Sequence, residues 1–315
     1  MPTTTYGPTT TAAEIVANVD LHGRRVVVTG ASSGIGVETA RALASTGAEV
    51  TLAVRNVEAG RKVADGIAEK LPPGAGGVQV APLDLADPAS VAGFVRAWSG
   101  PLHILVNNAG VMALPKLTLS PAGYEMQFAT NHLGHFALTT GLHQWLAAAE
   151  GARVVAVSSI GHLFCPVVFD DLHYRFRPYD QWTSYGQSKS AVVLFAVGAA
   201  QRWAGDGIAV NALMPGNIAS TALARHVGPD FLADLGKETD LTTLPPVKTI
   251  EQGAATSVLL AASPEVEGVS GRYYEDCAAA SVIHERAGHA GGVAPYVLDA
   301  DNADRLWLIS EELTQ

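Results

Sequence analysis

The stretch Thr29-Gly-Ala-Ser-Ser-Gly-Ile-Gly36 decides the fold that this sequence predicts. Before it, Arg24-Arg-Val-Val-Val28 is a short β-branched run that is typical of a buried parallel strand. After it, residues 37–45 carry apolar side chains at helical spacing. Glycines let a backbone approach a pyrophosphate closely, and a helix N-terminus offers it free N–H groups. Strand, glycine turn and helix therefore indicate a dinucleotide site, although the glycine spacing differs from the commoner G-x-G-x-x-G.

Strand and helix patterns alternate along the rest of the chain, which predicts an α/β fold. We expect a Rossmann-type, doubly wound, seven-stranded parallel sheet with helices on both faces, in a single domain. The expected strands are 25–29, 49–54, 78–83, 103–106, 153–158, 208–214 and 271–274. The expected helices are 35–45, 57–71, 89–98, 121–148, 185–203 and 250–262. Two long irregular stretches, 161–183 and 217–249, follow the fifth and sixth strands, where ligands bind in open α/β sheets.

Composition favours a globular enzyme in a reducing compartment. Hydrophobic residues make up 48% of the 315 residues and charged residues 16%, so a large core can form. The net charge of −10 and the lack of a basic run argue against nucleic acid as a partner. The two cysteines, Cys165 and Cys277, form no disulfide framework. Because the polar N-terminus shows neither a signal peptide nor a membrane anchor, we expect a cytoplasmic protein.

A tyrosine and a lysine lie four residues apart in Ser184-Tyr-Gly-Gln-Ser-Lys189. If the apolar run that follows is helical, Tyr185 and Lys189 share one helix face. A neighbouring cation favours the phenolate and lowers the pKa of the phenol from about 10. Such a tyrosine can act as a general acid or base near neutral pH.

Six short motifs follow one another along the sequence. They are the glycine turn, Asn107-Asn-Ala-Gly110, Asn131, Ser158-Ser159, Tyr185-x-x-x-Lys189 and Pro215-Gly216. In this order they resemble the short-chain dehydrogenase/reductases. Asn131-His-Leu-Gly-His-Phe136, Gly271-Arg-Tyr-Tyr-Glu-Asp-Cys277 and the tail 303–310 are similar to the retinol dehydrogenase and WW-domain oxidoreductase branch. The resemblance covers residues 19–313.

The resemblance implies a catalytic tetrad of Asn131, Ser159, Tyr185 and Lys189. Tyr185 would exchange the proton with the substrate oxygen, and Ser159, rather than Ser158, would hydrogen-bond that oxygen. Lys189 would hold the nicotinamide ribose, and Asn131 a water that links the lysine to solvent. Two donors aimed at the oxygen would stabilise the charge that a hydride leaves there. Asn131 could instead bend its helix, and Ser158-Ser159 could simply end a strand.

The second expected strand ends at Arg55-Asn56, where NAD sites usually carry an acidic residue. A guanidinium at Arg55 suits a 2′-phosphate, so we expect NADP(H) to be favoured over NAD(H). Asp84 and Leu85 should flank the adenine. The full cofactor set is Gly30, Ser32, Ser33, Gly34, Ile35, Gly36, Arg55, Asn56, Asp84, Leu85, Asn108, Ala109, Gly110, Tyr185, Lys189, Pro215, Gly216 and Ile218.

Apolar and aromatic residues of the two long loops predict a lipophilic substrate pocket. Its expected walls are Gly161, His162, Leu163, Phe164, Tyr179, Trp182, Met214, Leu223 and Phe231. The loop 217–249 could close over the substrate. The pair His132 and His135 has no third ligand nearby, so we assign it to packing and expect no metal.

We therefore expect an NADP(H)-dependent oxidoreductase that reduces a lipophilic ketone or aldehyde to an alcohol, or catalyses the reverse. Reduction of a carbon–carbon double bond on the same scaffold and a non-catalytic NADP-binding regulator are the alternatives. We expect a flexible segment at 1–18, the Rossmann domain at 19–277 and a C-terminal extension packed on it at 278–315. Family dimers pair the fourth and fifth helices, so a homodimer is compatible with this reading, although the extension could cover a second interface.

Overall fold

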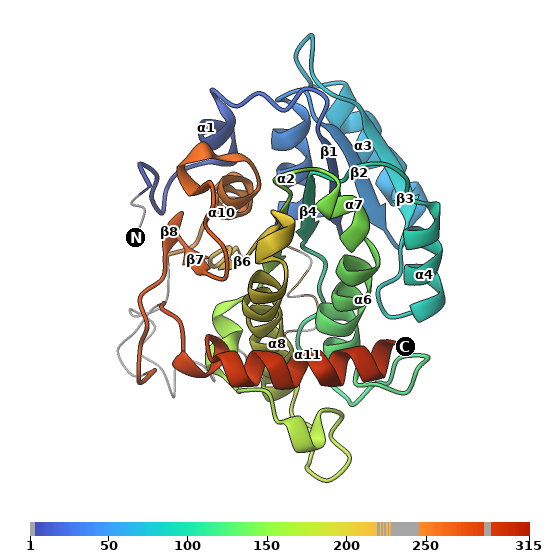
Figure 1. The fold of residues 1–315 in the computed structure, drawn as a ribbon, viewed down its shortest axis with the longest axis vertical. Coiled ribbons are helices and arrows are strands. Elements are labelled where there is room, and N and C mark those ends of the chain that lie inside the picture. The colour runs from blue at the N-terminus through green and yellow to red at the C-terminus, as the bar shows by residue number, and fades with distance from the viewer. Residues whose placement is uncertain are drawn as a thin grey trace.

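The computed structural model describes residues 4–218, 221, 223, 225, 227, 246–286 and 291–315. In this part of the chain one sheet has the strand order β3-β2-β1-β4-β5-β6-β7-β8 (Figure 1). The strands are β1 Arg25–Thr29, β2 Glu49–Val54, β3 Val78–Pro82, β4 Ile104–Asn107, β5 Arg153–Val157, β6 Ala209–Met214, β7 Tyr273–Glu275 and β8 Ala278–Ala279. The order reverses between β1 and β4, and this reversal creates the crevice where α/β sheets bind dinucleotides.

The predicted doubly wound α/β fold is confirmed, but the sheet is not the predicted seven-stranded parallel one. The strands β1 to β7 are parallel, whereas β8 runs antiparallel to β7 and pairs Ala279 with Tyr274. β8 has only two residues, too few to show an alternating pattern in the sequence. The valines of β1 are fully buried, as a strand covered on both faces requires.

Helices cover both faces of the sheet and form two apolar clusters with it. One cluster includes α4 Pro88–Ala97, α6 Gly134–Gly141, α7 His143–Ala147, α8 Gln181–Arg202 and α11 Ala300–Thr314. The other includes α1 Ala12–Val16, α2 Ile35–Ala44, α3 Val57–Ala68 and α10 Ile250–Ala262. Short helical turns are η2 Ile160–Leu163, η3 Phe169–Asp171, η4 Ala204–Asp206, η7 Pro264–Val266 and η8 Pro295–Val297. No helix of the described part of the chain is long and apolar enough to cross a membrane.

The predicted continuous helix over 121–148 was wrong. Helical structure begins at α5 Met126–Phe128, passes through the π-helix η1 Ala129–Leu133 and continues as α6 and α7. It begins there because the buried Glu125 carboxylate accepts hydrogen bonds from the N–H groups of Gln127 (3.0 Å) and Phe128 (2.8 Å). The π-helix places its widened turn at Asn131.

The two ends of the chain contain helices that the sequence analysis did not predict. Residues 1–18 were expected to be flexible. In the described part of this segment, Thr11 and Glu14 form a capping box at the start of α1, and Ile15 is buried. At the other end, α11 crosses α8, as Figure 1 shows. Its N-cap is Asp299, which accepts a hydrogen bond from the N–H of Asn302.

Candidate active site

Tyr185 lies near the start of α8, which begins after the N-cap Asp180. Its side chain is buried, and burial raises the pKa of Tyr185 to about 12, while a hydrogen bond with Ser159 acts in the opposite direction. The sequence predicted a pKa lowered by Lys189, and this was wrong. Losing the hydration of a phenolate costs more here than its neighbours return.

Lys189 lies one helical turn further along α8, on the same face as Tyr185. Its Nζ is 5.7 Å from the centroid of the tyrosine ring and donates a hydrogen bond to the carbonyl of Val157 at 2.9 Å. Burial lowers the pKa of Lys189 to about 8. The predicted meeting of phenol and ammonium is therefore present at the end of β5.

The two serines after β5 make different contacts. Ser158 Oγ donates to the carbonyl of Lys189 at 2.8 Å, and its backbone N–H donates to Leu213 of β6. Ser159 Oγ accepts from the N–H of Gly161 at 3.0 Å, and its hydroxyl lowers the pKa of Tyr185 against the effect of burial. Only Ser159 joins the tyrosine, which supports its assignment over Ser158.

Both polar atoms of the Asn131 side chain are hydrogen-bonded to other residues of the protein. Its Oδ1 accepts from the N–H of Val111 (2.8 Å), and its Nδ2 donates to the Val111 carbonyl and to Ser188 Oγ (both 2.9 Å). Its own carbonyl accepts from Nδ1 of His135 at 3.0 Å. A Cβ added to Gly110 would lie 3.3 Å from Asn131 Oδ1 and 3.6 Å from Lys189 Nζ, so Gly110 packs closely against both side chains.

The glycine turn after β1 is shaped for close approach. Gly30 and Gly34 have φ of +67° and +61°, a region that favours glycine. A Cβ on Gly30 would lie 2.8 Å from Ala109, and one on Gly36 would lie 2.5 Å from Asn108 Nδ2. At the N-terminus of α2 no side chain caps the helix, which leaves its first N–H groups for an anion. These residues fit the pyrophosphate of a dinucleotide. In the same turn Ser32 is half-buried and Ser33 exposed.

Thr29 joins the glycine turn to the rest of the site, a role that the sequence analysis missed. Its Oγ1 accepts from the N–H groups of Asn108 (2.9 Å) and Ala109 (3.0 Å). The same oxygen lies 2.9 Å from Nε2 of His135, whose other nitrogen bonds Asn131. One chain of hydrogen bonds thus connects the expected cofactor turn with the tetrad.

Arg55 follows β2 and is exposed, with no hydrogen bond or ion pair to any residue in the described ranges. The next residue, Asn56, is the N-cap of α3 and accepts from the N–H of Ala59 at 3.0 Å. Asp84 Oδ1 accepts from the N–H of Ala86 at 3.0 Å. The Arg55 guanidinium, unpaired among the described residues, follows β2 at the same edge of the sheet as the turn after β1.

The segment after β6 reaches back to the glycine turn. A Cβ on Gly253 would lie 2.7 Å from Ile218 and 3.0 Å from Ile35, so these three residues pack together. Gly216, which follows Pro215, has φ of +99°, and its Cβ would lie 2.7 Å from Cδ of Lys248. Lys248 is buried and pairs with Asp276 at 2.5 Å. No pattern in the sequence indicated this ion pair.

Some expected substrate residues lie at the tetrad. A Cβ on Gly161 would meet the Tyr185 ring at 2.7 Å, so only glycine lets the ring lie this close. Phe164 lies against α8, and its ring is 6.3 Å from that of Trp182. Met214 ends β6, which neighbours the strand that leads to the serines.

Other expected substrate residues are used differently or lie elsewhere. His162 is completely buried, and both of its ring nitrogens have partners within the protein. Tyr179 donates to the carbonyl of Leu114 and accepts from Gln127. Leu163 and Leu223 are half-buried, and Phe231 lies outside the described residues together with most of the loop 217–249.

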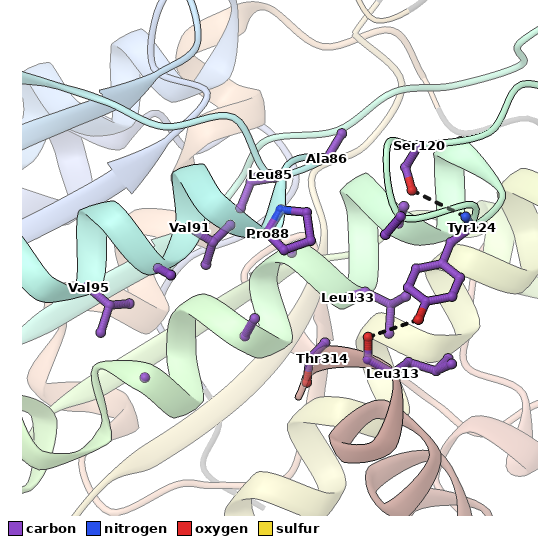
Figure 2. Close-up of a pocket in the computed structure, with 16 residues that line it drawn as sticks. Leu85, Ala86, Pro88, Val91, Val95, Ser120, Tyr124, Leu133, Leu313 and Thr314 are labelled. Carbon is purple, nitrogen blue, oxygen red and sulfur yellow. Dashed lines mark hydrogen bonds between the residues drawn. The ribbon is translucent and has the colours of Figure 1, made fainter.

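An apolar cavity of about 240 Å³ lies apart from the tetrad, between α4, α6 and the end of α11 (Figure 2). Leu85 and Leu133 belong to its wall, and the hydroxyl of Tyr124 donates to the Leu313 carbonyl at 3.2 Å. None of the four tetrad residues lines it. Leu85 is the one expected cofactor residue that does.

The His132 and His135 rings are both buried and are bound by the protein itself. Nε2 of His132 lies 2.7 Å from Ser310 Oγ in α11, and Nε2 of His135 lies 2.9 Å from Thr29 Oγ1. Burial lowers the pKa of His132 to about 3 and that of His135 to about 4. Within the described ranges no group of three or more His, Cys, Asp or Glu side chains is placed to hold a metal ion.

A glycine turn that fits a pyrophosphate, together with a half-buried Ser159 and the buried Tyr185 and Lys189, is the arrangement of a dinucleotide-dependent oxidoreductase. The chain belongs to the short chain dehydrogenase family, whose sequence model matches residues 24–230. Members of this family use NAD(P) to interconvert carbonyl compounds and alcohols. The chain falls in the retinol dehydrogenase-like branch predicted from the sequence.

Relatives and solved structures support this placement. A probable oxidoreductase from Streptomyces antibioticus is 56% identical over 92% of this chain and 97% of its own length. Human retinol dehydrogenase 12 is 39% identical over 94% of this chain and 88% of its own. The crystal structure of an uncharacterised Mycobacterium paratuberculosis protein is 34% identical, covers 97% of both chains and has a TM-score of 0.72. The Pseudomonas aeruginosa RhlG/NADP active-site complex has a TM-score of 0.63 at 26% identity, over 81% of this chain and 94% of its own.

Proposed function

We propose that this protein is an NADP(H)-dependent carbonyl reductase that converts a lipophilic ketone or aldehyde into an alcohol, or catalyses the reverse. The observation that carries the proposal is the buried Tyr185, one helical turn from Lys189 and close enough to the Ser159 hydroxyl for that group to act on its pKa. A pKa of about 12 keeps the phenol protonated at neutral pH, the form that can give a proton to a carbonyl oxygen.

The tetrad residues would share the work on the substrate oxygen. Bound NADPH would supply the hydride that reaches the carbonyl carbon. Tyr185 donates its proton to the oxygen, and the Ser159 hydroxyl hydrogen-bonds the same atom as negative charge develops. Lys189 would hold the nicotinamide ribose, and Asn131 fixes the backbone of Val111.

The preference for NADP(H) rests on Arg55. Its guanidinium has no partner among the described residues, so binding a 2′-phosphate would break no existing ion pair. The residue that follows is an amide, Asn56, and its side chain is occupied as the cap of α3. No carboxylate stands at either position to repel the phosphate.

Two observations support a lipophilic substrate. Near the start of α8, Phe164 packs against the helix with its ring 6.3 Å from that of Trp182, and Met214 ends the strand β6 beside β5. Several relatives are named retinol dehydrogenases, and retinol is a lipophilic alcohol. We therefore expect bulky ketones and aldehydes to be better substrates than sugar phosphates.

The test is a screen with NADPH and with NADH against acetophenone, 2-decanone, decanal and retinal, repeated with Tyr185→Phe. This variant keeps the ring and removes the exchangeable proton, so kcat should fall by at least about a hundredfold, the scale of general acid catalysis. Binding of NADPH, followed by fluorescence, should stay within about threefold of the unmodified protein. Near-normal turnover by the variant would show that Tyr185 is not the proton donor.

A further inference from the structure

His162 lies in the short helical turn η2, whose N-cap is Ser159. Its side chain is fully buried and makes contacts on both sides of the ring. Nδ1 lies 2.8 Å from the Ser159 carbonyl oxygen, and Nε2 accepts from the N–H of Ala294 at 3.3 Å. The ring also packs against Tyr273 with centroids 4.9 Å apart, and the Tyr273 hydroxyl lies 3.3 Å from Nδ1. The substrate cannot be what holds this histidine, because both nitrogens are already used.

The partners of the ring determine where its proton sits. A backbone N–H can only donate, so Nε2 facing Ala294 carries no proton. A neutral imidazole has one N–H, which is therefore on Nδ1 and donates to the carbonyl of Ser159. Protonating Nε2 would set two N–H groups against each other, and with burial this agrees with a His162 pKa lowered to about 4.

The contacts of His162 fix the position of the Ser159 backbone next to Tyr185. The Ser159 carbonyl accepts from two groups of one residue, the N–H of His162 at 3.2 Å and the ring Nδ1. Ser159 Oγ in turn accepts from the N–H of Gly161, which directs its own proton away from the turn. The hydroxyl is thus set as a donor toward the position where Tyr185 and the substrate oxygen would meet.

Two of the residues that hold His162, Ala294 and Tyr296, come from the C-terminal extension. Ala294 is followed by η8, in which the hydroxyl of Tyr296 donates to the His162 carbonyl at 2.5 Å. Ser190 Oγ of α8 lies 3.1 Å from the same carbonyl and 2.7 Å from that of Cys165. The segment 291–297 and the helix of Tyr185 therefore meet at one residue.

We propose that His162 is a positioning residue that orients Ser159 toward the substrate oxygen. The N–H of Ala294 keeps the proton of the ring on Nδ1, from which it is donated to the Ser159 carbonyl. The segment 291–297 therefore takes part in building the catalytic site. The inference rests on the proposed role of Ser159. It assigns His162 to the support of the serine rather than to the substrate pocket.

Two substitutions at His162 separate its two hydrogen bonds. The amide nitrogen of asparagine reaches the position of Nδ1, so His162→Asn keeps a donor for Ser159 and loses the acceptor for Ala294. The amide of glutamine reaches the position of Nε2, so His162→Gln keeps the contact with Ala294 and loses the donor. Each variant loses the ring and the polar contacts of one of its two nitrogens, so their midpoints of thermal unfolding should be similar.

We expect His162→Gln to lower kcat by at least about tenfold, because a poorly oriented donor loses much of its effect on the transition state. His162→Asn should stay within about threefold of the unmodified protein, and KM for NADPH should be unchanged in both. The assay uses NADPH and the carbonyl compound turned over fastest in the screen. Equal kcat values for the two variants would overturn the proposal, since loss of packing alone would affect both alike.

A second test needs no substrate and no change in η2. Ala294 has φ of −74°, which suits proline, so Ala294→Pro removes the N–H at a backbone angle that proline accepts. In 15N-histidine NMR the unmodified protein should show His162 protonated at Nδ1, and Ala294→Pro should show the other tautomer as well. Ala294→Gly keeps the N–H and should keep the Nδ1 tautomer. An Nε2-protonated ring in the unmodified protein would overturn the proposal, whether or not the His162 variants fold.

Ser159→Ala separates a failure of this inference from a failure of the proposed function. If Ser159→Ala keeps full activity, Ser159 does not hydrogen-bond the substrate oxygen during catalysis. That result would contradict both the proposed role of Ser159 and the positioning role of His162. If Ser159→Ala is inactive, His162→Gln should add little further loss in that background, because it acts through the serine. Independent, multiplying losses would show that His162 acts by another route.

Discussion

Burial moves the two titratable groups of the candidate site in opposite directions. It raises the pKa of Tyr185 to about 12 and lowers that of Lys189 to about 8. In both cases the charged form is the one that loses its hydration. At neutral pH both groups therefore keep their protons, which gives a neutral phenol beside an ammonium that is 5.7 Å from the ring centroid.

Arg55 is the residue at which we expect cofactor choice to be decided. Arg55→Asp removes the partner of the 2′-phosphate and adds a like charge. Charge-assisted hydrogen bonds are worth about 1.5–3 kcal/mol, so kcat/KM for NADPH relative to NADH should fall by about tenfold to a hundredfold. Arg96→Asp, an equal charge change at an exposed position in the last turn of α4, is the control. If Arg55→Asp still prefers NADPH as the control does, another residue discriminates the cofactors.

At the scale of elements, α11 is part of the core. Trp307 is buried, with its ring 4.9 Å from that of Phe136 in α6 and stacked on Phe195 of α8 at 6.0 Å. Ser310, one turn later, lies 2.7 Å from His132, the residue after Asn131. The C-terminal helix therefore packs against both the π-helix η1 and α8, the helix that carries Tyr185.

Removing the indole from α11 should be costly. Trp307→Ala leaves a cavity between the rings of Phe136, Phe195 and Trp203, and such changes cost about 3–5 kcal/mol of unfolding free energy. Leu308→Ala on the same helix is the matched control, because Leu308 is 63% exposed, and it should change the free energy by less than about 0.5 kcal/mol. Urea unfolding measures both. A similar, small effect of the two variants would mean that α11 does not contribute to the stability of the domain.

For the whole molecule, buried neutral histidines predict sensitivity to acid. Burial lowers the pKa of His132 to about 3 and those of His135, His162 and His173 to about 4. In the unfolded chain each of these histidines has a pKa of about 6.5. Between pH 6.5 and 4 the unfolded state therefore binds more protons than the folded state, so the unfolding free energy falls as the pH falls. Above pH 6.5 this contribution is fully present.

The expected size of this effect follows from the shifts. At pH 5, about 1.5 units below the unfolded pKa, each fully buried ring lowers the unfolding free energy by on the order of 2 kcal/mol relative to pH 8. Urea unfolding at pH 8 and pH 5 measures the sum, and His132→Gln should reduce the difference by about one ring's share. An unfolding free energy that is the same at the two pH values would contradict the assignment of these rings as neutral.

Much of the fold and of the site could be predicted because their signals are local. The bounds of β1, β2 and α10 match the prediction, since each follows from a continuous apolar pattern and its flanking residues. The tyrosine and lysine meet because a helix places residues four apart on one face. The glycine turn was recognisable because φ near +60° and contacts below 3 Å with Ala109 and Asn108 leave room only for glycine.

Other features depend on neighbours distant in the sequence, and only the tertiary structure decided them. The predicted helix 121–148 starts later because the buried Glu125 carboxylate caps it, and its π-turn surrounds an Asn131 side chain bound to Val111. The pKa of Tyr185 is set by burial that the i, i+4 spacing does not reveal. The proton of His162 is placed by Ala294, 132 residues away. Periodicity and spacing record which elements form and what they can present, whereas hydration, protonation and tautomer depend on which atoms the folded chain brings within hydrogen-bond distance.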